Sequence, residues 1–255
     1  MPPAKPGDWL NLHKEEGQTF KQYLACKPTL PRGQRTVLYI QPVGEFAVDE
    51  RRIVELTWEF MGLFYNLPVR TLPDLSIHGI PVKARRVHPT TRDSQVLTSY
   101  VLKDLLKPRL PSDAAAMLAL TTSDLWPGEG WNFVFGQASL SERVGVWSIR
   151  RYGDPSKGPA AFRLCLRRAI ATAAHETGHM FSIRHCIRYG CTMNGSESLE
   201  ESDRQPLELC PECLAKVCWA TRTPPLDRFH KLAEFCEKTG LLQEGDFLPK
   251  VDQGT

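Results

Sequence analysis

The chain has 255 residues, of which 42% are hydrophobic and 24% are charged, the usual proportions of a globular protein with a full core. Its net charge of +3 is too small to indicate nucleic acid or an anionic membrane as a partner, and no apolar run is long enough to cross a bilayer. The first residues lack the apolar segment of a signal peptide, so we expect a cytoplasmic protein. We also expect a monomer.

Predicted helices and strands follow one another from the N-terminus. The N-terminal extension, residues 1–34, is polar, and within it residues 8–24 are expected to form one short helix that packs on the main body and carries no chemistry. A β-branched and aromatic run predicts a buried strand at 36–41. After it, Asp49 is expected to cap a helix that ends near residue 65.

The central part of the chain continues this alternation. Residues 114–121 fit a helix or a strand by periodicity alone, and their length and the loop after them favour a strand. The other expected elements are a strand at 69–72, a loop at 73–92, a helix from Asp93 or Ser94 to about residue 107, strands at 132–135 and 144–149, a long helix at 160–182 and an amphipathic helix at 228–238.

This order of elements predicts the class of fold. Strands that alternate with helices and then follow one another indicate an α+β fold, with a mixed twisted sheet of about five strands covered by helices. We expect one subdomain at 35–182, which holds the sheet and the long helix, and a small C-terminal subdomain at 183–255.

The sequence His-Glu-Thr-Gly-His lies near the end of the long predicted helix. Side chains four residues apart share a helical face, so His175 and His179 point to one place, and Glu176 lies close enough to reach a water there without being a ligand. Neutral imidazoles suit zinc, and a catalytic zinc site keeps one position open for water. H-E-x-x-H with a third histidine is a metalloprotease signature. The pattern therefore predicts a zinc-dependent hydrolase.

His185 is the predicted third ligand. At 100° per residue it cannot share the helical face of His179, so the helix must end and the chain must turn back at Ile183 and Arg184. Two alternatives stay open. The three histidines share no metal, or the third ligand is a downstream glutamate, for which the candidates are Glu197, Glu200 and Glu201.

Four of the eight cysteines lie close to the histidines in the sequence, and they are Cys186, Cys191, Cys210 and Cys213. They would make a closed Cys₄ zinc site that stabilises structure. Because neighbouring side chains in an extended segment point to opposite sides, His185 and Cys186 can serve two different sites. The alternatives are two disulfides, free thiols, or a redox C-x-x-C, although no thioredoxin-like strand precedes that motif.

These residues together resemble a known family. The pattern H-E-x-x-H-x₅-H-C-x₄-C-x-M, followed after sixteen residues by C-P-x-C, is similar to that of the archaemetzincins, a branch of the metzincin zinc peptidases. The resemblance implies a metzincin-like fold and two zinc ions per chain, a catalytic one on the histidines and a structural one on the cysteines. It also implies that Glu176 is the general base and that Met193 forms the Met-turn beneath the catalytic site.

By the same resemblance, the strand at 132–137 is the upper edge of a cleft in which a peptide or protein substrate aligns through main-chain hydrogen bonds. The expected substrate-binding residues are Phe133, Phe135, Gly136 and Gln137. We expect no nucleic-acid or membrane partner, since the charge is nearly balanced and no basic and aromatic stripe surrounds the cysteines. The alternative function is a pseudo-protease that binds zinc and peptides without turnover.

One residue departs from the family pattern. The pattern has glycine three residues after the second histidine, where this chain has Ser182. If the position requires a positive φ, a serine there costs about 1 kcal/mol or more of backbone strain. The orientation of His185 depends on this turn.

Overall fold

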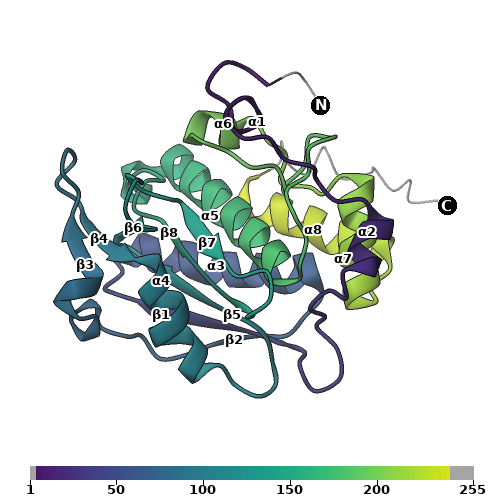
Figure 1. Cartoon of the computed structure of the whole chain (residues 1–255), viewed down its shortest axis with the longest axis horizontal. Coiled ribbons are helices and arrows are strands. Elements are labelled where there is room, and N and C mark those ends of the chain that lie inside the picture. Colours follow the sequence, from purple (N-terminus) through teal and green to yellow (C-terminus); the bar gives the residue numbers. More distant parts are fainter. Residues whose placement is uncertain (1–3, 242–255) are drawn as a thin grey trace.

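A five-stranded sheet forms the centre of the computed structural model, which describes residues 4–241 (Figure 1). The strand order is β2-β1-β5-β8-β7, in which all pairs are parallel except that of β7 with β8. The mixed sheet of about five strands is therefore confirmed. Its strands are β1 (Val37–Val43), β2 (Val69–Thr71), β5 (Ala114–Thr121), β7 (Gly136–Ala138) and β8 (Val144–Ser148).

Two long helices, α3 (Val48–Tyr65) and α5 (Pro159–Met180), pack on one face of this sheet. Trp58 of α3 meets Trp147 of β8 edge to face, with ring centroids 5.7 Å apart, a geometry that adds to their burial. The opposite face is covered by a smaller apolar cluster that includes the π-helical turn Val101–Leu106. Every residue of β1, β5 and β8 is buried, so α5 rests on a fully covered, rigid platform.

A second, three-stranded sheet consists of β3 (Arg85–Val87), β4 (Ser94–Leu97) and β6 (Asp124–Trp126). The helix expected from Asp93 or Ser94 is therefore wrong over its first residues. β4 pairs with β3 on one side and with β6 on the other, and these contacts override the local helical pattern. The helical part begins only with α4 (Thr98–Tyr100).

The N-terminal extension does not form the single expected helix. It has two short helices, α1 (Trp9–Leu12) and α2 (Phe20–Ala25), with an extended segment between them. Gly17 has φ of +67°, and the Thr19 side chain accepts a hydrogen bond from the Gln22 backbone N–H while the Gln22 side chain accepts from that of Thr19. This capping box starts a new helix at Phe20. In Figure 1, α1 lies beside α6 and α2 lies beside α7.

Other expected boundaries move by a few residues. Helix α3 begins at Val48, so Asp49 lies in its first turn and is not its cap. The strand expected at 132–135 pairs only at Val134, and regular pairing begins with β7 at Gly136. The long helix predicted at 160–182 is confirmed as α5.

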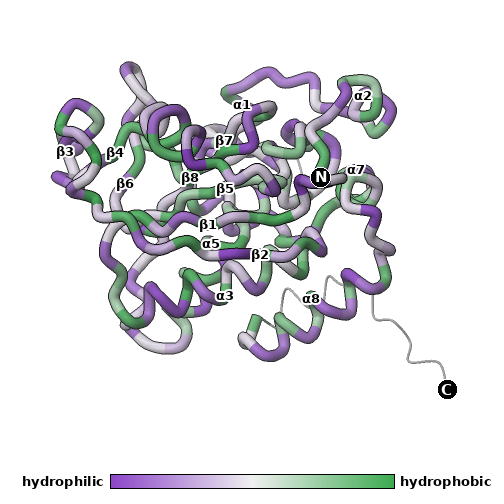
Figure 2. Tube along the Cα trace, turned by 90° about the horizontal axis from the view of Figure 1, so that it is seen from below, coloured by the Kyte–Doolittle hydropathy of each residue, from purple (hydrophilic) through white to green (hydrophobic). Residues whose placement is uncertain are grey.

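The C-terminal part is helical, with α6 (Leu199–Asp203), α7 (Pro211–Thr221) and α8 (Pro225–Thr239). The amphipathic helix predicted at 228–238 is confirmed as α8, on which apolar and polar residues alternate in Figure 2. Within residues 4–241, no helix is long and apolar enough to span a membrane.

Candidate active site

His175, His179 and His185 converge at one point. The first two lie one turn apart on α5, with their Nε2 atoms 2.9 Å apart. His185 reaches them from the segment that follows the helix, and its ring centroid lies 5.1 Å from that of His175 and 4.9 Å from that of His179. One nitrogen atom of each histidine lies within 4.8 Å of the others, a spacing that a single metal ion can bridge.

The hydrogen bonds of the three Nδ1 atoms test whether this group fits a metal. The Nδ1 atom of His175 lies 2.9 Å from the Thr192 carbonyl, and that of His179 lies 2.7 Å from the Ile183 carbonyl. Because a carbonyl can only accept, both Nδ1 atoms carry the proton and both Nε2 atoms present a lone pair. The Nδ1 atom of His185 lies 2.8 Å from the Glu15 carboxylate. This is the arrangement found around histidine ligands in metal sites, so the residues fit zinc.

The charge state of these histidines agrees with that role. Burial and the neighbouring imidazoles lower the pKa of His175 well below its usual value and that of His179 to about 4. Both rings are therefore neutral at pH 7, as a metal ligand must be.

In the turn between the second and third histidines, the residue at position 182 has a positive φ, the conformation in which a serine is strained. Helix α5 ends at Met180, and Ser182 has φ of +64°. Its hydroxyl donates to the Leu140 carbonyl at 2.9 Å and accepts from the Thr29 backbone N–H at 3.1 Å. Two hydrogen bonds that glycine could not make offset the strain of about 1 kcal/mol.

Glu176 lies beside the histidines, with 6% of its surface exposed. Its carboxylate meets the backbone of the edge strand at Gly136, where an added Cβ would lie 2.6 Å from the Glu176 Oε1 atom. A larger residue at this position would displace the Glu176 carboxylate. Burial raises the pKa of Glu176 to about 8 in the metal-free protein, which makes it a stronger base than an exposed glutamate.

This raised pKa predicts how the stability of the metal-free protein depends on pH. The unfolded chain releases the Glu176 proton near pH 4.5, whereas the folded protein keeps it to about pH 8. Folding stability therefore falls between these values, by at most about 1.4 kcal/mol per pH unit. The neutral Glu176→Gln removes this loss, so we expect the variant to gain on the wild type from pH 5 to pH 8.

Urea unfolding of both metal-free proteins at the two pH values measures this difference. Glu234→Gln is the control, because Glu234 is exposed on α8. An advantage of Glu176→Gln that is the same at pH 5 and pH 8 would contradict the raised pKa.

A cleft of about 480 Å³ opens above the histidines and Glu176. Phe133, Phe135 and Gly136 line it, as expected for substrate-binding residues, and their segment leads into the sheet's edge strand β7. Gln137 also borders the cleft, but its side chain accepts a hydrogen bond from the Thr98 hydroxyl. Trp9 and residues 194–197 also line the cleft.

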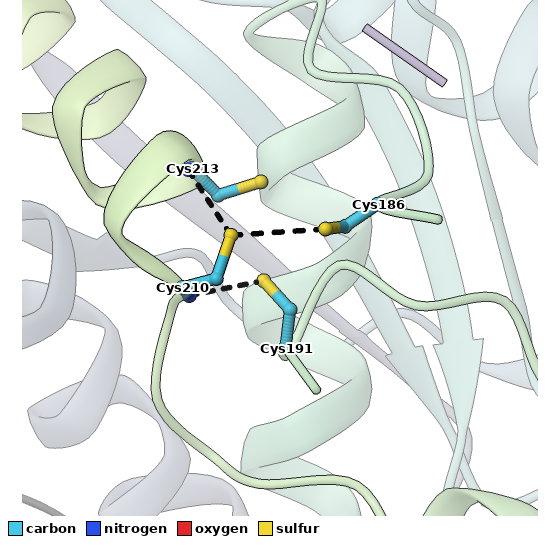
Figure 3. Close-up of side chains that lie close together, drawn as sticks. All are labelled: Cys186, Cys191, Cys210 and Cys213. Carbon is cyan, nitrogen blue, oxygen red and sulfur yellow. Dashed lines mark hydrogen bonds between the residues drawn. The ribbon is translucent and has the colours of Figure 1, made fainter. Parts of the chain in front are cut away.

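Cys186, Cys191, Cys210 and Cys213 form a second cluster, in which the four sulfur atoms lie within 4.8 Å of one another. Figure 3 shows the thiols pointing to a common centre, with Cys210 and Cys213 at the start of α7. All four are buried and none forms a disulfide. Backbone N–H groups reach two of the sulfur atoms, Cys210 N–H to Cys191 Sγ at 3.3 Å and Cys213 N–H to Cys210 Sγ at 3.4 Å. Such hydrogen bonds suit thiolates that hold a metal.

Met193 and Asn194 join the two clusters. Met193 is fully buried against α5, where a Cβ added to Gly178 would lie 2.4 Å from the Met193 Sδ atom, and its carbonyl accepts from the Cys186 N–H at 2.8 Å. The Asn194 side chain accepts from the Cys191 N–H at 2.8 Å and donates to the Tyr189 carbonyl at 2.9 Å. The loop between the first two cysteines is therefore fixed from below the histidines.

Sequence reasoning missed Glu15 and Asn194. Glu15 lies in no motif, and its contact joins residues 170 positions apart. Asn194 directly follows Met193 of the family pattern, but the pattern gives it no role. Gly17 and the capping box at Thr19 are local signals that residues 13–18 are not helical. The downstream glutamates Glu197, Glu200 and Glu201 do not join the histidines in the described part of the chain.

Comparisons with known proteins agree with this geometry. The model of peptidase family M54 matches residues 110–218. Archaemetzincin-2 of Homo sapiens is 33% identical, over 91% of this chain and 72% of that protein, and archaemetzincin-1 of Homo sapiens is 30% identical, over 88% of this chain and 51% of that protein. The archaemetzincin structure from Methanopyrus kandleri superposes with a TM-score of 0.59 at 28% identity, over 76% of this chain and 99% of that one.

The fold, the histidine site and these similarities define the class of protein, which is a zinc metallopeptidase and thus a hydrolase. The chain belongs to the archaemetzincin family, as the pattern of histidines and cysteines indicated.

Proposed function

We propose that this protein hydrolyses peptide bonds with a water molecule activated by Glu176 at a zinc ion held by His175, His179 and His185. The observation that carries the proposal is the convergence of the three imidazoles, each with its Nδ1 atom engaged by a hydrogen-bond acceptor. The three Nε2 atoms are then oriented for one cation, and three protein ligands leave a position for water, as catalytic zinc sites do.

When bound, zinc lowers the pKa of a water molecule to about 7 and polarises the scissile carbonyl. Glu176 accepts the proton of the attacking water and passes it to the leaving amine. Its place beside Gly136 holds the carboxylate at the cleft wall, where the substrate would lie. The low exposure of Glu176 keeps bulk water away from the transferred proton.

The substrate would bind as an extended peptide along β7. Among the strands of residues 4–241, this one is paired on one side only, with β8, so its outer edge can take main-chain hydrogen bonds from a peptide. Phe133 and Phe135 stack edge to face with centroids 5.2 Å apart, and their rings offer apolar surface to substrate side chains.

A second zinc would occupy the cysteine cluster. Four buried sulfur ligands form a closed tetrahedral site with no position for substrate, so its role is structural. We propose that it holds residues 183–241 as a subdomain against α5.

A peptide-library cleavage assay on protein of measured zinc content tests the function. We expect about two zinc ions per chain and cleavage that stops when a chelator removes them. A folded protein that holds both ions but cleaves no member of the library would support a pseudo-protease instead. The hydrogen bonds of Ser182 remove the main reason for that alternative.

A further inference from the structure

The segment from Glu15 to Thr29, here called the N-terminal clasp, lies against the turn that carries the third histidine. We propose that the clasp is a positioning element for the catalytic metal and that Glu15 is the residue that orients His185. This inference rests on the proposed function, because it takes His185 as a zinc ligand.

The contacts between the clasp and the turn are numerous and specific. Four of the five residues from Phe181 to His185 form a hydrogen bond with it, through backbone or side chain. The bonds are Tyr23 hydroxyl to Phe181 carbonyl at 3.0 Å, Gln18 amide to Ser182 carbonyl at 3.1 Å, Thr29 N–H to Ser182 hydroxyl at 3.1 Å, Arg184 N–H to Gln18 amide oxygen at 3.2 Å, and His185 Nδ1 to Glu15 carboxylate at 2.8 Å.

The contact of Glu15 with His185 differs from those of the other two histidines. His175 and His179 are oriented by neutral backbone carbonyls, from Thr192 and Ile183. His185 is oriented by both oxygens of a carboxylate, at 2.8 and 3.0 Å, with only 26% of the Glu15 side chain exposed. A carboxylate fixes the tautomer of the ring and makes its Nε2 atom a stronger ligand. It also places a negative charge near a dication whose three ligands are neutral.

The orientation of His185 depends on such a contact more than the orientations of His175 and His179 do. His175 and His179 are held by a regular helix, whereas His185 follows a residue with a positive φ and lies beyond the end of α5. A loop residue has more freedom than a helical one, so its orientation depends on the contacts around it. In the described structure, the hydrogen bond to the His185 ring comes from the clasp, and Trp9 packs edge to face on the same ring with centroids 5.2 Å apart.

The clasp itself is fastened to the helix that begins with the cysteine cluster. The Lys216 ammonium, with 1% of the residue exposed, donates to the Gln18 carbonyl, and the Glu212 carboxylate accepts from the Phe20 N–H. Trp219 packs edge to face on the Tyr23 ring, with centroids 6.0 Å apart. A continuous path thus runs from the structural cluster through α7 and the clasp to the third histidine.

The affinity of the histidine site for metal tests the proposal. Cobalt(II) replaces zinc in the full-length protein, and its binding is followed by chelator competition. The charge-transfer bands from thiolate to cobalt report occupancy of the cysteine site. Ligand-field absorption that grows with no increase in these charge-transfer bands reports occupancy of the histidine site. We expect Glu15→Ala to weaken cobalt binding at the histidine site by about 10–100-fold and to leave the cysteine site unchanged. Glu15→Gln, which keeps an acceptor but loses the charge, is expected to fall between Glu15→Ala and the wild type.

Glu16→Gln is the matched control, because it removes the same charge from the adjacent, exposed residue, and we expect wild-type affinity. Wild-type affinity in Glu15→Ala, or an equal loss in Glu16→Gln, would overturn the proposal. If Glu15→Ala does not fold, Glu15→Gln decides, since it matches the shape of glutamate. Failure of the proposed function looks different, because the wild type itself would then bind no metal at the histidines.

Discussion

Glu176→Gln is expected to lower kcat by about 10²–10⁴-fold, the range typical of a lost general base, and to leave the zinc content unchanged. Glutamine matches the shape of glutamate but cannot accept the proton of the attacking water. Zinc binding should persist because the three histidines, and not Glu176, converge on the metal position. The effect on KM should be small, since Glu176 acts on the water and not on the peptide.

Steady-state kinetics on a peptide found by the library assay, with zinc measured on the same samples, provide the data. Glu200→Gln is the control, because the Glu200 side chain is 83% exposed and was one of the glutamates considered as a third ligand. We expect its kcat to match the wild type. If Glu176→Gln kept more than a tenth of the activity, another group would have to be the base. A loss of zinc would instead make Glu176 a ligand.

The parts of the site that the sequence predicted are those set by local spacing. His175, Glu176 and His179 lie on one regular helix, so a 3.6-residue period is enough to place them. The C-x₄-C and C-x-x-C pairs are also local, and both pairs meet in the structure. The buried strands were also predicted from local features. β1 was predicted from a β-branched and aromatic run, and β5 from its length and the loop after it, since periodicity alone also fitted a helix. β8 was predicted as well.

The parts that sequence reasoning could not predict depend on contacts between distant segments. β4 becomes a strand because β3 and β6 pair with both of its edges, and no local pattern contains those partners. Glu15 meets His185 in a folded chain in which α2 docks against α7, and no local pattern contains that contact. The same docking brings the Thr29 N–H to the Ser182 hydroxyl, to which it donates a hydrogen bond. The contacts that stabilise a serine in place of the family glycine therefore could not be predicted from the sequence.

The histidine and cysteine clusters share one stretch of backbone, and this has an energetic consequence. His185 and Cys186 are adjacent, and the Cys186 N–H bonds the carbonyl of Met193 beneath the catalytic helix at 2.8 Å. A metal ion on the cysteines would fix the conformation of this stretch before His185 binds the catalytic metal ion. The ordering of His185 would then be supplied by folding, which makes the catalytic ion bind to a preformed site.

Cys210→Ser should therefore weaken the histidine site, although Cys210 is not part of that site. The Cys210 Sγ atom lies 3.7 Å from that of Cys186, and a serine hydroxyl is a poor replacement for a thiolate on zinc. Because structural zinc contributes about 10–16 kcal/mol of binding free energy in small zinc domains, even partial loss should lower the unfolding free energy by several kcal/mol. We expect the cysteine-site zinc to be lost, the melting temperature to fall, and binding at the histidine site to weaken as the turn loosens.

Zinc content, thermal unfolding and peptide cleavage of the same preparation separate these effects. Cys218→Ser is the matched control, because Cys218 lies on the same helix α7, is half-buried and is outside the cluster. We expect it to keep both zinc ions and its activity. If Cys210→Ser lost only the cysteine-site zinc and cleaved peptides at the wild-type rate, the histidine site would be independent of the cysteine cluster. If it kept both ions, the cluster would not be a zinc site. Activity that falls together with the cysteine-site zinc, in a protein that is still folded at the assay temperature, would show that the structural ion aims the third catalytic ligand.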